Sequence, residues 1–302
     1  MQADPKVLRQ RVFKCEVCAG SGFGFSRIDA DAPLSKFPPT IGSSRAAPLL
    51  FIGTNPRISN TNRQLYAEIM RSPESFDLLA QDVWRGRSYL RFGEPGHHYD
   101  LHIAIAQKAF PGRPFASVAA VTELFLCATL DGGLLPNVGS KCADLYLDEV
   151  ARQVGPQVVV AVGAKARDYL VGRRLCTGIP FKAELGEGIV VVAPVPHPAA
   201  WGAKSGINAY IEWAAEVIHA ATNGSADFPP PPRDLGRPFT QRQLAAWLIH
   251  SNPTISAGDL AGRLAAAFPP PAYKVGLRHG AHYLSLYRTG KLDVPASDPR
   301  DW

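Results

Sequence analysis

The sequence of 302 residues contains no apolar run that approaches the roughly 20 residues a membrane-spanning helix needs. Its start, MQADPKVLRQ, has no apolar stretch of the kind found in signal peptides. We therefore expect a cytoplasmic protein with no membrane partner. Charged residues make up 19% of the chain and hydrophobic residues 46%, a balance that excludes global disorder and predicts a sizeable core.

Cysteine is scarce, and positive charge is in mild excess. Five cysteines in a reducing compartment favour metal or thiol chemistry over disulfides. The formal net charge of +6 fits a nucleic-acid partner, because phosphates attract Lys and Arg. The length allows one large domain and one small one.

Four short apolar runs predict buried strands, and amphipathic helical patterns separate them. The runs are 48–53, 116–127, 157–163 and 188–195. Continuous apolar strands that alternate with helices are typical of a parallel sheet covered on both faces. The predicted fold is therefore α/β: a three-layer αβα sandwich with a central, mainly parallel four-stranded sheet. In such sheets ligands bind at the carboxyl ends of the strands.

A proline-rich segment divides the chain. We expect residues 1–225 to form the α/β domain, including its N-terminal cysteine pair, and residues 226–238 to form a linker. The four consecutive prolines there exclude a helix or a central strand and favour a stiff, extended path. Residues 239–302 show two helical patterns and predict a small helical region, which either contacts DNA or caps the structure.

Two loops that follow predicted strands carry polar residues suited to catalysis. In GTNPRIS (53–59), Gly53 permits a sharp turn and presents Asn55, whose amide could hold a water or a base. In VPHPAAW (195–201), His197 lies between two prolines, where an imidazole can donate a hydrogen bond to a leaving group that gains negative charge. Taken singly, these features also fit an ordinary Asn-Pro turn and a surface histidine.

Taken together, G-x-N-P after the first strand and H-P-x-x after the last resemble the two motifs of the uracil-DNA glycosylase superfamily. The segment 156–172 also looks like the strand–Gly–helix segment of that family, and the resemblance spans roughly residues 10–220. It implies a DNA glycosylase of base excision repair, which hydrolyses the N-glycosidic bond of a flipped-out deaminated or damaged base. Asn55 would then position the attacking water, and His197 would stabilise the departing base anion.

The same resemblance gives roles to three further residues. GHHYD (96–100) resembles the aromatic segment of the mismatch branch, which makes Tyr99 the candidate platform for the base. Trp201 stands where family members commonly carry the Leu that enters the duplex as a wedge. Glu123 stands where iron–sulfur members usually carry an Asn that pairs with the uracil edge.

Glu123 leaves the substrate and the function open. An ionised Glu only accepts hydrogen bonds, whereas Asn both donates and accepts. A carboxylate would suit a donor edge such as cytosine N4 or a modified base, and a protonated Glu could mimic Asn if its pKa is raised. The alternative function is a non-catalytic protein that binds DNA or a modified nucleotide on the same fold.

Four cysteines form the pattern C-x2-C…C-x14-C: Cys15, Cys18, Cys127 and Cys142. This pattern resembles that of the iron–sulfur glycosylase branches, which hold a [4Fe–4S] cluster on four cysteines. Four thiolates also suit zinc, and CEVCAGSG (15–22) looks like the zinc repeats of chaperone co-factors, so zinc is the alternative. The fifth cysteine, Cys176, is expected to be a buried apolar residue.

Overall fold

The computed structural model describes residues 4–17, 36–43, 46–54, 57–58, 72, 74–75, 98–130, 141–176, 178–197, 207–232, 241–267, 277–292 and 294–295. The chain divides into two compact units. The first comprises Met1–Cys176 and Pro180–Pro232, and the second consists mainly of Arg233–Trp302. The division therefore falls inside the proline-rich segment 226–238.

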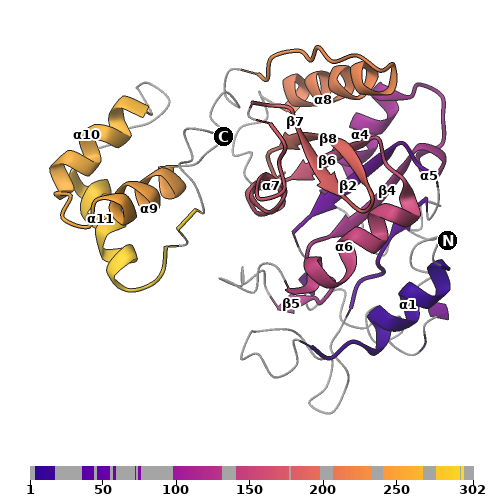
Figure 1. Ribbon diagram of the computed structural model, residues 1–302, viewed down its shortest axis with the longest axis horizontal. Helices are drawn as coiled ribbons and strands as arrows, with labels where there is room; N and C mark the ends of the chain where they lie inside the picture. The colour runs from indigo at the N-terminus through magenta and orange to yellow at the C-terminus, as the bar shows by residue number, and fades with distance from the viewer. Residues whose placement is uncertain are drawn as a thin grey trace. The chain divides into compact units, whose positions relative to one another are not determined.

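The first unit is an α/β structure built around one large sheet (Figure 1). Its strands are β1 (Ile41–Gly42), β2 (Leu49–Gly53), β4 (Ala119–Glu123), β6 (Val158–Val162), β7 (Phe181–Leu185) and β8 (Gly188–Val195). Its helices are α1 (Pro5–Lys14), α4 (His98–Ala109), α5 (Phe115–Val118), α6 (Lys141–Val154), α7 (Ala164–Val171) and α8 (Ile207–Thr222). Two short strands, β3 (Arg57–Ile58) and β5 (Thr129–Leu130), pair separately.

The sheet is mixed and has six strands in the order β1-β4-β2-β6-β8-β7. Strands β4, β2, β6 and β8 run parallel to one another, while β1 and β7 pair antiparallel at the two edges. The four apolar runs of the sequence contain the four parallel strands. The predicted sheet was too small, because it omitted both edge strands.

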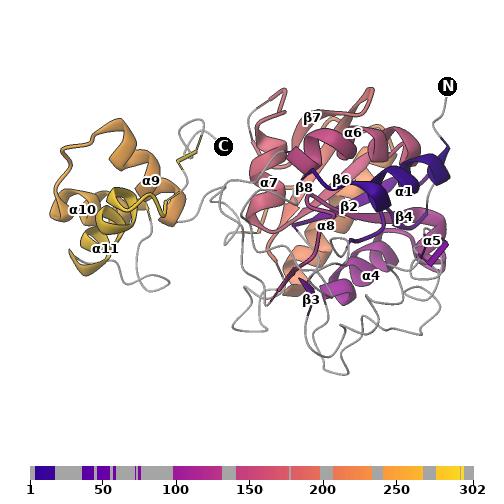
Figure 2. The same ribbon diagram turned by 90° about the horizontal axis from the view of Figure 1, so that it is seen from below.

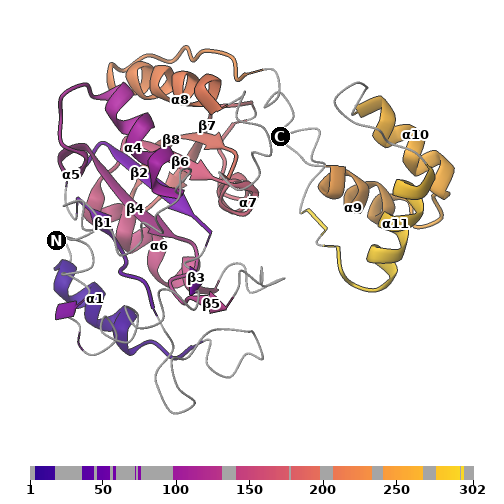
Figure 3. The same ribbon diagram turned by 180° about the vertical axis from the view of Figure 1, so that it is seen from behind.

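Helices pack on both faces of the sheet. In β2, Leu50 and Ile52 belong to a core cluster with residues of α1, α6 and α7, whereas Phe51 lies against Phe115 of α5, on the opposite face. Figure 2 shows α1, α6 and α7 on one side of the sheet and α4 on the other. Helix α8 packs beside α4, as a second view also shows (Figure 3). Successive side chains of a strand point to opposite faces of the sheet, so β2 contributes to the core on each face.

Helix α6 is amphipathic, as expected of the helical patterns between the apolar runs, and buries one stripe along residues 147–154. Leu147, Val150, Ala151 and Val154 are all buried. Every residue of β6 is buried as well, as expected of a central parallel strand with helices on both faces.

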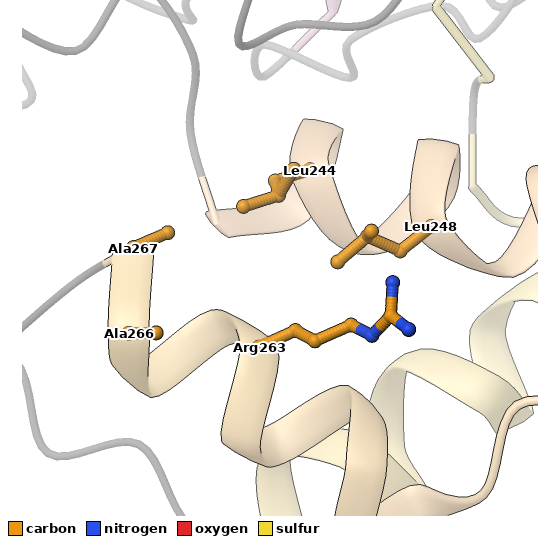
Figure 4. A pocket seen from close by; sticks show the side chains of 5 residues that line it. All are labelled: Leu244, Leu248, Arg263, Ala266 and Ala267. Atoms are coloured by element: carbon orange, nitrogen blue, oxygen red, sulfur yellow. The ribbon is translucent and has the colours of Figure 1, made fainter.

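The second unit contains three described helices, α9 (Gln241–Ser251), α10 (Ala257–Ala267) and α11 (Leu277–Arg288), around an apolar core of its own. A capping box begins α10: the backbone N–H of Asp259 donates to Ser256 Oγ at 3.0 Å, and that hydroxyl donates to the Asp259 carboxylate at 2.7 Å. A cavity of about 310 Å³ lies between α9 and α10 (Figure 4). Its lining is apolar apart from one guanidinium: Leu244, Leu248, Arg263, Ala266 and Ala267.

A search of the helices in the described part of the chain finds none with both the length and the apolar character needed to cross a membrane.

Candidate functional site

The four parallel strands end together at one edge of the sheet. Gly53 at the end of β2 lies opposite Glu123 at the end of β4, and Val162 at the end of β6 lies opposite Val195 at the end of β8. The loops that follow these strands therefore start side by side. This is the edge at which a parallel α/β sheet places its ligands.

Glu123 is buried at this edge, with only 5% of its surface exposed. Its carboxyl group lies over the end of the neighbouring strand: a Cβ at Gly53 would be 2.8 Å from Glu123 Oε1 and closer still to Oε2. Burial raises the pKa of the Glu123 carboxyl to about 8. At neutral pH the group is therefore mainly a neutral acid, which can donate one hydrogen bond as well as accept others.

Two backbone hydrogen bonds tie the loop after β2 to the loop after β4. The N–H of Leu124 donates to the Gly53 carbonyl at 3.1 Å, and the N–H of Phe125 donates to the Thr54 carbonyl at 3.0 Å. These bonds continue the pairing of the two strands past their ends. The chain that leads into Asn55 thus starts directly beside Glu123.

His197 reaches the same edge from β8 and is partly buried. It lies against Gly163, the residue after β6, where a Cβ would be 3.2 Å from His197 Cβ. Gly163 has a φ of +90°, which strongly favours glycine, and its N–H donates to the Val195 carbonyl at 2.8 Å. Glu123 therefore leans over β2 and His197 over β6, two strands that are neighbours and lie roughly 4.8 Å apart.

Tyr99 lies in the first turn of α4. Because α4 ends at Ala109, just before α5 leads into β4, its C-terminus lies at the amino edge of the sheet. A helix of 12 residues is about 18 Å long, so its first turn reaches back toward the carboxyl edge. The Tyr99 side chain lies outside the part of the chain that the structure describes, and Asn55 and Trp201 lie outside it entirely.

His102, one turn after Tyr99, was not among the site residues predicted from the sequence. His102 is fully buried, and its ring packs on Phe51 with the centroids 4.7 Å apart. Phe51 precedes Gly53 by two residues on the same face of β2. The sequence could have predicted the burial of His102, because it lies on the same helix face as the apolar residues of α4, namely Leu101, Ile105 and Ala106.

Three of the four patterned cysteines come from separate elements that meet. Cys15 follows α1, Cys127 follows β4, and Cys142 lies in the first turn of α6. The backbone N–H of Leu126 donates to Cys142 Sγ at 3.3 Å. The pKa of the Tyr146 hydroxyl is raised above its ordinary value. The main cause is burial, followed by a hydrogen bond to Cys15 and by the charges of Cys15 and Cys142.

A buried lysine links the segments that hold Cys15 and Cys127. Lys36 is only 1% exposed and pairs through its backbone with Cys127. Its Nζ donates to the Phe13 carbonyl at 2.7 Å and to Glu16 Oε1 at 3.1 Å, on either side of Cys15. Nothing in the sequence pattern distinguished this lysine.

The remaining cysteines differ from these three. Cys18 lies outside the described residues. Cys176, expected to be buried, is exposed, because it lies in the turn that precedes edge strand β7. Within the described ranges, no three His, Cys, Asp or Glu side chains form a group that could hold a metal ion.

No protein-family model matches this chain, and no curated protein is significantly similar to it. The fold and the site therefore assign the protein to a structural class only. The first unit is an α/β structure with a mixed six-stranded sheet, whose carboxyl edge carries a buried acid against Gly53 and a partly buried histidine against Gly163.

Proposed function

We propose that this protein is a DNA N-glycosylase, which hydrolyses the N-glycosidic bond of a deaminated or damaged base during base excision repair. The observation that carries the proposal is the placement of Glu123 and His197 over two neighbouring strand ends, each against a glycine. The helices on both faces of the sheet support the finer fold assignment, a three-layer αβα sandwich like that of the uracil-DNA glycosylase superfamily.

Each group at this edge has a chemical task in such a reaction. A flipped-out base enters a pocket and departs as an anion, whose charge must be stabilised. His197 donates a hydrogen bond to that anion, the kind of contribution that is often the largest in catalysis. Asn55 holds the water that attacks the sugar, Tyr99 provides an aromatic surface for the base, and Trp201 fills the gap left in the duplex.

The cysteines would hold a [4Fe–4S] cluster on Cys15, Cys18, Cys127 and Cys142, with zinc as the alternative. The segments that carry Cys15, Cys127 and Cys142 meet, and a backbone N–H donates to Cys142 Sγ, which supports this proposal although the three thiols do not by themselves form a metal-holding group among the described residues. Such a cluster supplies a structural cross-link. It would fix the segment after α1 to the loop after β4 and to the start of α6.

DNA is the proposed partner, and the net charge of +6 supports it. We expect the affinity for DNA to fall steeply as salt is added, because Lys and Arg displace condensed counterions from the phosphates. The cytoplasm is the proposed location.

Labelled oligonucleotides that carry uracil, hypoxanthine, xanthine or a G·T mismatch test this function. Strand cleavage by alkali after incubation reveals abasic sites. We expect wild type to produce them on at least one substrate and His197→Ala to be roughly 100- to 1,000-fold slower. His219→Ala, an exposed histidine in α8, is the matched control and should retain full activity.

Two outcomes would contradict the proposal. Full activity of His197→Ala would remove the role assigned to that side chain. If wild type binds these oligonucleotides but cleaves none, the alternative holds: a protein that binds DNA or a modified nucleotide without cleaving it.

A further inference from the structure

The positive charge of the chain is concentrated in its small second unit. Residues 233–302, which make up nearly all of that unit, contain nine Lys and Arg against five Asp, a formal charge of +4. Residues 1–232 contain the other 23 Lys and Arg against 21 Asp and Glu, a formal charge of +2. The attraction of a polyanion is therefore directed mainly to the unit that does not contain the candidate site.

One side of α11 carries basic and hydroxyl side chains, which we call the basic face. Its members are Arg278, His282, Ser285, Arg288 and Thr289, and all five are exposed. They follow one another at intervals of three or four residues, or are adjacent, so they share one side of the helix. Helix α11 contains no acidic residue at all.

The opposite side of α11 fixes the helix to its unit. Gly280 and Leu284 are buried there, and α11 packs against both α9 and α10 (Figure 3). A Cβ at Gly280 would overlap the Ala257 carbonyl oxygen, so the two helices touch through their backbones at this point. The basic face is thus held outward on a packed helix.

Two further cations lie at the C-terminal end of α11, beyond Arg288. Lys291 is exposed, and Arg242 of α9, also exposed, donates a hydrogen bond to the Lys291 carbonyl. Within the described part of the second unit, Asp259 is the only acidic residue, and its carboxylate accepts from the Ser256 hydroxyl. Positive charge therefore dominates the surface around the basic face.

We propose that the basic face of α11 binds the phosphate backbone of duplex DNA, as a second DNA contact apart from the candidate site. Arg, Lys, Ser and Thr are side chains that donate to phosphate oxygens. From Arg278 to Thr289 the helix is about 16 Å long. Duplex DNA carries one negative charge for roughly every 1.7 Å of its axis, so this length faces several phosphates. The contact goes beyond the proposed function, because it requires neither a damaged base nor catalysis.

The chemistry of the basic face favours DNA over an acidic protein or a membrane. Protein interfaces are centred on aromatic or aliphatic side chains that become buried, and the basic face contains none. A helix that lies on a membrane inserts its apolar side into the lipid, whereas the apolar side of α11 is packed inside its unit. Polar donors alone suit a hydrated polyanion.

The test measures the affinity of the full chain for a labelled, undamaged duplex of about 20 base pairs, from about 50 to about 200 mM salt. The variant is Arg278→Gln combined with Arg288→Gln. We expect it to bind about tenfold more weakly at the lowest salt, and the slope of log affinity against log salt to become shallower by about 2. The loss should be the same on a duplex of unrelated sequence, because phosphates are common to both.

The matched control removes two exposed arginines from the first unit, Arg113→Gln combined with Arg152→Gln. It makes the same change in net charge and should keep the affinity of wild type within about twofold. Equal weakening in the two double variants would overturn the assignment to α11. So would a folded Arg278/Arg288 variant that binds like wild type, a wild type that does not bind the duplex, or tighter binding to double-stranded RNA of the same length.

A substitution that adds charge tests the same face without any risk from misfolding. Ser285→Lys places a cation in the middle of the basic face and should tighten binding severalfold, with a slope steeper by about 1. Ser117→Lys, at an exposed position in α5, is the control and should leave the affinity unchanged. If Ser285→Lys binds no better than Ser117→Lys, the basic face does not contact DNA. All these measurements use undamaged DNA, so their outcome is independent of whether the protein removes a base.

Discussion

The carboxyl group of Glu123 occupies the space in which a side chain at Gly53 would begin. From the sequence, we predicted that Gly53 allows a sharp turn after the strand. In the structure, Gly53 is still part of β2 and pairs in register with Glu123. Glycine is needed at this position because it leaves room for the neighbouring carboxyl.

Substitution of Gly53 by Ala should therefore act through Glu123. The new methyl group would overlap the carboxyl and force it out of its position, so we expect a loss of roughly 1–3 kcal/mol in the free energy of unfolding. Denaturant unfolding measures this loss. In a Glu123→Ala background the same substitution should cost clearly less, because the overlapping group is gone. Equal costs in the two backgrounds would show that the overlap is relieved in some other way.

The pH dependence of stability gives a second prediction that requires no substrate. The ordinary pKa of a glutamate is 4.5, and burial raises that of Glu123 to about 8 in the folded protein. Between these values the folded protein holds a proton that the unfolded chain has lost. The stability contributed by Glu123 is thus fully present below about pH 4.5 and is lost as the pH rises through about 8.

Glu123→Gln should remove this dependence. We expect the variant to gain roughly 2–4 kcal/mol over wild type between about pH 5 and about pH 8, since one pKa unit corresponds to about 1.4 kcal/mol. Urea unfolding at the two pH values measures the difference. Glu184→Gln, an exposed position on β7, is the control and should show little change. Parallel pH curves for wild type and Glu123→Gln would contradict the raised pKa.

Lys36 provides a third prediction. Its ammonium group is buried and donates to the Phe13 carbonyl and to Glu16. Lys36→Met keeps most of the apolar stem but leaves that carbonyl without this donor, so we expect a loss of about 2–3 kcal/mol in the free energy of unfolding. Lys108→Met is the matched control: Lys108 pairs with Glu212, both half-exposed, and its loss should cost about 0.5 kcal/mol or less. Equal losses in the two variants would mean that Lys36 does not hold the segment around Cys15.

The four parallel strands could be predicted because each is a continuous apolar run, as burial on both faces requires. Strand β1 could not be predicted, because a strand of two residues is too short to show a hydrophobic pattern. Strand β7 does show an alternating pattern, which we overlooked. Its apolar residues Phe181, Ala183 and Leu185 are buried, and the charged residues between them are exposed. This alternation is typical of a strand with one solvated face.

The residues of the candidate site could likewise be predicted from the sequence only in part. Motif order placed His197 after the last parallel strand and Glu123 within the second apolar run, 116–127, whose strand ends at Glu123 in the structure. The burial of Lys36 and His102, and the contact of Glu123 with Gly53, depend on segments distant in the sequence that meet only in the fold. A local pattern cannot report such neighbours.

The cysteine pattern yields the last prediction. Protein purified without oxygen should be brown and contain about four irons, with acid-labile sulfide, per chain. Cys142→Ser should lose this iron and unfold at a lower temperature, because Cys142 is buried where α6 meets the loop after β4. Cys176→Ser is the matched control and should keep full iron content, since Cys176 is exposed and outside the pattern. One zinc in place of iron would favour the zinc alternative. Wild-type protein with neither metal would contradict both sites and leave Cys15, Cys127 and Cys142 as core residues, since cysteine packs as a small apolar side chain when it binds no metal.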